Sequence, residues 1–191
     1  MTLAIVACDD VPKTPWKNGG GFARDLLSWP DSFDWALRIS VADVERDGPF
    51  SDYAGVERWF AVLEGTGVTL SFADNGEKRI LTRDDPPFRF DGARALHCTL
   101  ASGPTRDFNV MFAHDRGEGS CAVVQSGQSW RDDSELRAIF SVSRLRLVLG
   151  DDSVELPPMS LAWSRQLRGQ TWRVDDGGRA FWIAYRTKVA R

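Results

Sequence analysis

The 191-residue chain has few of the side chains that bind transition metals or form disulfides. It contains two histidines, His97 and His114, which form no H-x-H pair, and three cysteines with no C-x-x-C motif. A transition-metal site needs several convergent nitrogen, sulfur or oxygen ligands, and a lone strand histidine is usually structural. We therefore expect no metal and no cofactor. Cys8, Cys98 and Cys121 are expected to be buried thiols in a reducing compartment, most simply the cytoplasm.

Other absences exclude whole classes of protein. No apolar run approaches the ~20 residues of a membrane span, and the opening "MTLAIVACDDVPK" has neither a basic start nor a cleavage site. That opening predicts a first β-strand. The 24 basic and 27 acidic residues are mixed along the chain without a basic stripe, so we expect no nucleic-acid partner and no membrane partner. G-x-S-x-G, P-loop and dinucleotide motifs are missing as well.

The residues that are present indicate an all-β protein. Apolar side chains make up 42% of the chain, enough to fill a large core. In "WALRISVA" the residues Trp35, Leu37, Ile39 and Val41 share one face of a strand. Some dozen such runs are separated by turn signals, and hairpins are predicted at 65–67, 75–76 and 176–178. This spacing favours a sandwich or a barrel.

One segment departs from the period of two. "SWRDDSELRA", residues 129–138, suggests a helix from its composition. The polar stretch "HDRGEGS", residues 114–120, is the best candidate for a boundary between two β-units. We therefore predict an N-terminal barrel over 1–115 and a C-terminal barrel over 116–191.

Four polar blocks carry a family resemblance: "PWKNGGGFARD", "DGPFSDYAGVERW", "FDG" and "DFNVM". In order and spacing they resemble the HutD family, which includes the protein called Ves. The resemblance is strong up to about residue 112. It implies two cupin-like β-barrels in one compact chain, a bicupin of the RmlC-like jelly-roll type. It also implies an association with bacterial histidine utilisation, in which a member binds a metabolite such as N-formylglutamate or urocanate.

The first block contains three consecutive glycines, Gly19 to Gly21. Glycine stabilises neither a helix nor a strand interior, but it permits positive φ and close backbone approach. One interpretation is a tight structural loop. The other is a loop over the mouth of the first barrel, with Trp16, Lys17, Asn18 and Arg24 as ligand-binding residues.

The strand period also selects residues in the later blocks. In "DFNVMF", Asp107 and Asn109 share a face, opposite a set of core residues. Arg58 begins the strand "RWFAVL" on the face of Phe60, so its charge must leave at the strand end or meet an anion. Arginine offers paired donors that match a carboxylate. The structural alternative for each arginine is an exposed rim or an ion pair with Asp107 or Asp25.

Three functional hypotheses follow from these residues. The first is a metal-free, non-enzymatic protein that binds a small carboxylate metabolite and moderates histidine utilisation. The second is a cupin-type isomerase or hydrolase acting on a similar acid, with Asp107 or an arginine in the chemistry. The third is a protein-interaction module that uses the eight tryptophans as an interface. Whether the chain forms a homodimer is left open.

Overall fold

A computed structural model describes residues 3–16 and 18–188. Within these ranges the chain forms nineteen β-strands, and its one helix is a 3-10 turn at Cys8–Asp10, so the all-β prediction is confirmed. The strands form two compact units, one of residues 12–116 and one that joins residues 3–11 to 117–188. No helix in the described part is long and apolar enough to cross a membrane.

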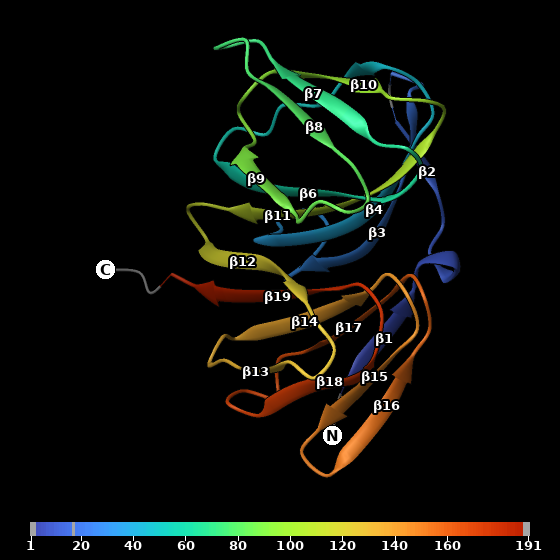
Figure 1. The fold of residues 1–191 in the computed structure, drawn as a ribbon. Coiled ribbons are helices and arrows are strands. Elements are labelled where there is room, and N and C mark those ends of the chain that lie inside the picture. Colours follow the sequence, from blue (N-terminus) through green and yellow to red (C-terminus); the bar gives the residue numbers. More distant parts are fainter. Residues whose placement is uncertain (1–2, 17, 189–191) are drawn as a thin grey trace. The chain divides into compact units, whose positions relative to one another are not determined.

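The N-terminal unit contains two sheets (Figure 1). A six-stranded sheet has the order β2-β3-β4-β11-β6-β9, and a four-stranded sheet has the order β5-β10-β7-β8. Neighbouring strands in both sheets pair antiparallel in the described part of the chain. The strands are β2 (Thr14–Pro15), β3 (Gly21–Trp29), β4 (Leu37–Val44), β5 (Gly48–Pro49), β6 (Val56–Glu64), β7 (Val68–Phe72), β8 (Lys78–Leu81), β9 (Phe88–Asp91), β10 (Leu96–Leu100) and β11 (Thr105–Ala113).

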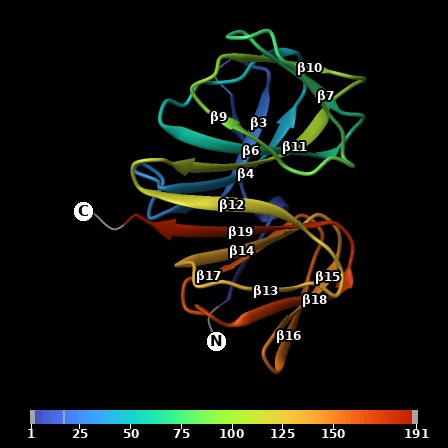
Figure 2. The same cartoon turned by 60° about the vertical axis from the view of Figure 1, so that its left-hand side comes forward.

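The C-terminal unit is also built from a larger and a smaller sheet, and Figure 2 shows these two layers from a second side. Their orders are β1-β17-β14-β19-β12 and β13-β18-β15-β16. The strands are β1 (Ala4–Ala7), β12 (Gly117–Val124), β13 (Ser129–Arg131), β14 (Leu136–Ser141), β15 (Leu145–Leu149), β16 (Asp152–Leu156), β17 (Ser160–Ser164), β18 (Thr171–Gly177) and β19 (Ala180–Thr187).

Alternating side chains explain how the N-terminal unit forms its core. Val68, Leu70 and Phe72 of β7 are buried and pack with residues of β6, β9 and β10 in one apolar cluster. The same alternation buries Leu96 and Cys98 of β10 while Thr99 stays exposed. Removing apolar surface from water is the main stabilising contribution to such a barrel, at about 25 cal/mol per Å².

The turn predictions have mixed outcomes. Residues 65–67 connect β6 to β7 as predicted, but they do not form a hairpin, because β6 pairs with β11 and β9 whereas β7 pairs with β10 and β8. The hairpin at 75–76 is confirmed, since it joins the paired strands β7 and β8. The hairpin at 176–178 is wrong, because β18 pairs with β15 whereas β19 pairs with β14 and β12. Asp176, Gly177 and Gly178 therefore carry the chain from one sheet to the other.

The helix suggested for residues 129–138 is also wrong. Ser129–Arg131 forms β13, and the segment from Leu136 onward forms β14, whose six residues are all buried. The polar centre of the segment makes a turn in which the Ser134 amide donates to the Asp132 carboxylate. Tertiary burial of the apolar end outweighs the weak helical propensity of the charged middle. The three cysteines are buried as expected.

Candidate functional site

The N-terminal unit contains a cavity of about 460 Å³. Its wall is formed by inward-facing residues of β2, β3, β4, β6 and β11 and by the segment that follows β5. Small-molecule sites are usually concave and largely apolar, with a few placed polar groups. Trp16, Phe50 and Phe60 supply aromatic surface here: the rings of Trp16 and Phe50 meet edge to face at 6.2 Å, and Phe50 and Phe60 lie 5.7 Å apart.

The glycine run positions one wall of this cavity. Gly19 has φ +69°, which favours glycine, and a Cβ at Gly21 would lie 2.1 Å from the Asp43 carbonyl oxygen, so position 21 requires glycine. The Asn18 side chain accepts from the Gly20 amide at 3.0 Å and donates to the Pro49 carbonyl at 3.4 Å. These contacts hold the loop against the segment after β5, and both Trp16 and Asn18 line the cavity.

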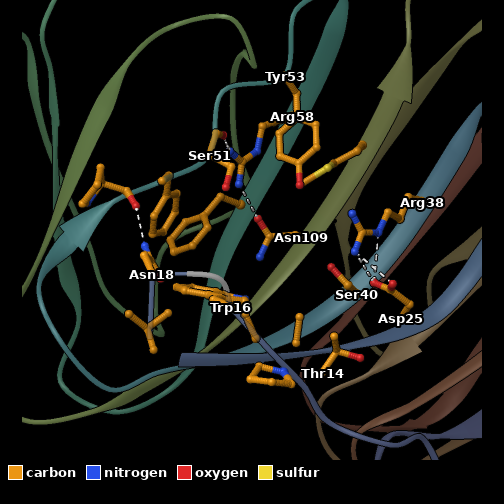
Figure 3. Close-up of a pocket in the computed structure, with 18 residues that line it drawn as sticks. Thr14, Trp16, Asn18, Asp25, Arg38, Ser40, Ser51, Tyr53, Arg58 and Asn109 are labelled. Carbon is orange, nitrogen blue, oxygen red and sulfur yellow. Dashed lines mark hydrogen bonds and ion pairs between the residues drawn. The ribbon is translucent and has the colours of Figure 1, made fainter. Parts of the chain in front are cut away.

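Arg58 is the most unusual residue of the site. It lies on β6 opposite Met111 of β11, and its side chain is only 5% exposed. Its Nη2 donates to Asn109 Oδ1 at 3.1 Å and its Nη1 donates to the Ser51 carbonyl at 3.2 Å (Figure 3). Its buried Nε has no hydrogen-bond partner among the described residues. No carboxylate in the described chain forms an ion pair with this guanidinium.

Aromatic rings surround the Arg58 charge. The guanidinium carbon lies 5.4 Å from the Phe50 ring centre, 5.5 Å from that of Tyr53 and 5.2 Å from that of Phe90. Burial lowers the pKa of Arg58 to about 10, and the nearby Arg38 charge acts in the same direction. The group is therefore still cationic at neutral pH, although its environment favours the neutral form. A buried cation of this kind is stabilised when an anion joins it.

A second polar group lies elsewhere on the cavity wall. Arg38 of β4 donates from Nε and Nη2 to the two carboxylate oxygens of Asp25 on β3, both at 2.9 Å. This is a paired, charge-neutral unit, and Ser40 lies beside it in Figure 3. Taken together, Arg58, Arg38 and Asp25 give the wall one net positive charge. The wall therefore matches a ligand with at least one negative charge.

Asp107 does not line this cavity. It is fully buried on β11 between Ala42 and Val62 of the neighbouring strands. Thr105 Oγ1 donates to Oδ2 at 2.9 Å, and the buried Oδ1 has no partner in residues 3–16 and 18–188. Burial raises the pKa of Asp107 to about 8, and the Asp43 charge adds to that shift. Asp107 therefore carries a proton at neutral pH, inside the barrel.

The remaining predicted residues are placed as follows. Arg24 is buried outside the cavity lining and donates to Asp43 at 2.9 Å, while Lys17 lies outside the described residues. The structure adds Ser51 and Tyr53, which the strand period did not select. Both belong to the block "DGPFSDYAGVERW", so the block itself was the available signal.

The described residues contain no group of three or more His, Cys, Asp or Glu side chains that could hold a metal ion. His97 and His114 are both exposed, on β10 and just after β11. The expected absence of a metal stays a prediction.

The family model of HutD matches residues 8–182. The chain belongs to the HutD family. It is 39% identical over 158 residues to an uncharacterized 21.2 kDa protein in the hutC 3′ region of Pseudomonas putida, a match that covers 81% of this chain and 77% of that protein. Protein Ves of Citrobacter koseri is 36% identical over 120 residues, covering 60% of this chain and 62% of Ves.

Solved structures agree with this membership. HutD from Pseudomonas fluorescens SBW25, in a formate condition, has a TM-score of 0.86 at 25% identity and covers 98% of this chain and 100% of that one. Oxalate decarboxylase of Bacillus subtilis has a TM-score of 0.65 at 7% identity, covering 97% of this chain and 78% of that one, which shows the fold alone. The chain thus has the bicupin fold.

Proposed function

We propose that the N-terminal barrel binds a small carboxylate metabolite of histidine breakdown and that this binding moderates histidine utilisation. One observation carries the proposal: Arg58 is a buried cation at the wall of a 460 Å³ cavity, with an unpartnered Nε and no carboxylate of its own. A ligand carboxylate would supply the missing charge and accept from the guanidinium. The family's name and the hutC-linked relative support the connection with histidine utilisation.

The Asp25–Arg38 pair suits the second polar end of such a ligand. N-formylglutamate would direct a second carboxylate to Arg38, whereas urocanate would direct an imidazole N–H to Asp25. The aromatic surface of Trp16 and Phe50 suits the carbon skeleton between the two ends. Asn109 keeps the Arg58 guanidinium oriented, because its amide oxygen accepts from Nη2.

The test is calorimetric titration with urocanate, N-formylglutamate, formate and glutamate. Removing one partner of a buried charge pair typically costs about 2–5 kcal/mol, so Arg58→Ala should weaken the binding of the true ligand by roughly 30-fold or more. Arg58→Lys should recover part of the affinity, because ammonium lacks the paired donors. Arg89→Ala is the matched control, since Arg89 is an exposed arginine on β9 outside the cavity.

Melting curves of the same variants complete the experiment. If Arg58→Ala unfolds the barrel or leaves every affinity unchanged, Arg58 is a structural residue and the proposal is wrong. If a bound compound is converted, the isomerase or hydrolase hypothesis replaces it. Asp107 would then enter only through a rearrangement, because its carboxyl lies outside the cavity lining.

A further inference from the structure

The two units follow the same pairing scheme, strand for strand. In the N-terminal unit β6 pairs with β11 and β9, and β7 pairs with β10 and β8. In the C-terminal unit β14 pairs with β19 and β17, and β15 pairs with β18 and β16. The connections β6–β7 and β14–β15 both cross from the larger to the smaller sheet, and each has three residues between its strands. Counting back from these connections gives a residue-by-residue correspondence.

The correspondence places a second arginine inside the C-terminal barrel. Phe60, which lines the first cavity, corresponds to Arg137 of β14, because Phe60 lies four residues before the end of β6 and Arg137 lies four residues before the end of β14. On the neighbouring strands Asn109 is opposite Phe60 and Ala184 is opposite Arg137, and Ala184 belongs to the buried core of the C-terminal unit. Arg137 is therefore inward-facing, and it is only 1% exposed.

Few protein groups compensate the Arg137 charge. Arg137 Nη1 donates to the Gln170 carbonyl at 2.6 Å, and the buried Nη2 has no partner within the described part of the chain. The guanidinium carbon lies 5.4 Å from the Trp172 ring centre. Burial lowers the pKa of Arg137, while the charges of Asp132 and Asp133 oppose the shift. Neither aspartate forms an ion pair with it in the described part of the chain.

Further unpartnered polar atoms lie in the same cluster. Among the described residues, the buried Nε1 atoms of Trp130 and Trp172 have no acceptor, and the buried Oε1 of Gln170 has no donor. Trp130 and Trp172 are cross-strand neighbours, and their rings pack on Trp182 at 5.5 and 5.2 Å. Arginine and tryptophan side chains only donate. Three of the four unpartnered atoms are thus donors without an acceptor.

We propose that the C-terminal barrel binds a small anion at Arg137, of the size of chloride or formate, with the indole of Trp172 as a second donor. An anion explains the pattern better than water does, because it compensates the buried charge as well as the donors. Without a bound anion, a protein with an apolar residue at position 137 would be as stable as the wild type or more stable. This site is separate from the Arg58 site and does not depend on the proposed function.

The test uses an Arg58→Met background, in which anion binding at the first cavity is removed. Melting temperatures are measured in chloride or formate against gluconate at constant ionic strength. We expect a rise of about 5–10 °C when the small anion exceeds its Kd by about a hundredfold. The Arg58→Met/Arg137→Met protein should lose that rise. Arg58→Met/Arg131→Met, which changes an exposed arginine of β13, should keep it.

A direct readout covers the case in which Arg137→Met fails to fold. Chloride or formate titrated into Arg58→Met should change the tryptophan fluorescence in a saturable way, because Trp172 adjoins the site. Arg58→Met/Arg137→Lys should bind more weakly. An unsaturable fluorescence change, or equal anion dependence with and without Arg137, would overturn the proposal. Comparing the affinities for chloride and formate shows whether the site prefers an inorganic ion or a carboxylate.

Discussion

The N-terminal and C-terminal units arrange eight equivalent strands in the same order but use their interiors differently. The first interior contains a cavity bounded by Asn109, with the buried Asp107 two residues away on β11. The corresponding positions of β19 hold Ala184 and Trp182. Trp182 packs with Trp172 and eleven other buried residues in one apolar core. At these inward positions the first unit leaves a cavity, whereas the second unit is filled by indole rings that pack beside Arg137.

The difference has a cost in stability. A filled interior gains dispersion contacts around each large side chain, and a hollow one leaves those contacts unmade. Each unit retains a buried arginine, but the N-terminal unit also retains the fully buried carboxyl of Asp107. Binding sites commonly sacrifice stability in this way. We therefore expect variants of the two units to respond differently.

The largest expected effect is at the filled interior. Trp182→Ala should lower the free energy of unfolding by about 3–5 kcal/mol, because it removes a fully buried indole and leaves a cavity. Trp16→Ala, at the wall of the first cavity, should cost roughly 1 kcal/mol or less. Urea denaturation measures both. Similar losses for the two tryptophans would remove the distinction between a filled and a hollow interior.

The second prediction concerns Asp107 and pH. Its pKa is about 8 in the folded state and near 3.8 when unfolded, so the folded state holds a proton that the unfolded state has released. Stability contributed by this group is therefore present at low pH and lost as pH rises toward 8. In Asp107→Asn the free energy of unfolding should therefore fall by about 2–3 kcal/mol less than in wild type over this pH range. One titrating group changes that free energy by at most ~1.4 kcal/mol per pH unit. Parallel stability–pH curves for wild type and Asp107→Asn between pH 4 and 9 would contradict this.

The third prediction concerns the second polar end of the first cavity. Arg38→Gln keeps a hydrogen-bond donor but loses the charge and the paired geometry. N-formylglutamate should bind about tenfold more weakly, which corresponds to ~1.4 kcal/mol, while formate should change by less than about twofold. Competition calorimetry measures the two ratios. If both ligands weaken equally, Arg38 acts on Arg58 and not on the ligand.

The smallest expected effect is that of metal removal. Elemental analysis of protein purified without chelator should find no stoichiometric Fe, Zn, Mn or Ni, and chelator should leave carboxylate binding unchanged. A one-to-one ion bound through His97 would contradict the prediction and favour the enzyme hypothesis.

The sequence predicted much of the fold and part of the site. The period of two identified the strands because each has one buried face, and it placed Arg58 and Asn109 on the cavity side of β6 and β11. It could not place Arg24, whose charge is taken up by Asp43, nineteen residues away on the neighbouring strand. Period two also placed Asp107 on the face of Asn109, but it carries no information on depth. Asn109 lines the cavity, whereas Asp107 is buried outside its lining.

The pairing of strands was the feature of the fold that the sequence predicted least well. The turn at Asp176–Gly178 has a hairpin signature, yet Gly177 is at φ +153° in a strand paired with β15, beside a register shift near Arg146. The Asp-Gly-Gly sequence reflects the backbone freedom of glycine, and it does not specify which strands pair. Likewise, the alternation in residues 4–7 predicts a strand but names no partner, and the structure pairs it with β17.

That pairing sets an order of events during synthesis. The partners of Ala4–Ala7 are Ser160–Trp163, so the edge of the five-stranded sheet cannot close until more than 150 intervening residues have been made. At about 5–20 residues per second, β1 is synthesised roughly 8–30 s before β17. The N-terminal barrel, residues 12–116, can complete its own pairings in that interval. Although β1 precedes the other strands of the structure, it is thus among the last to pair.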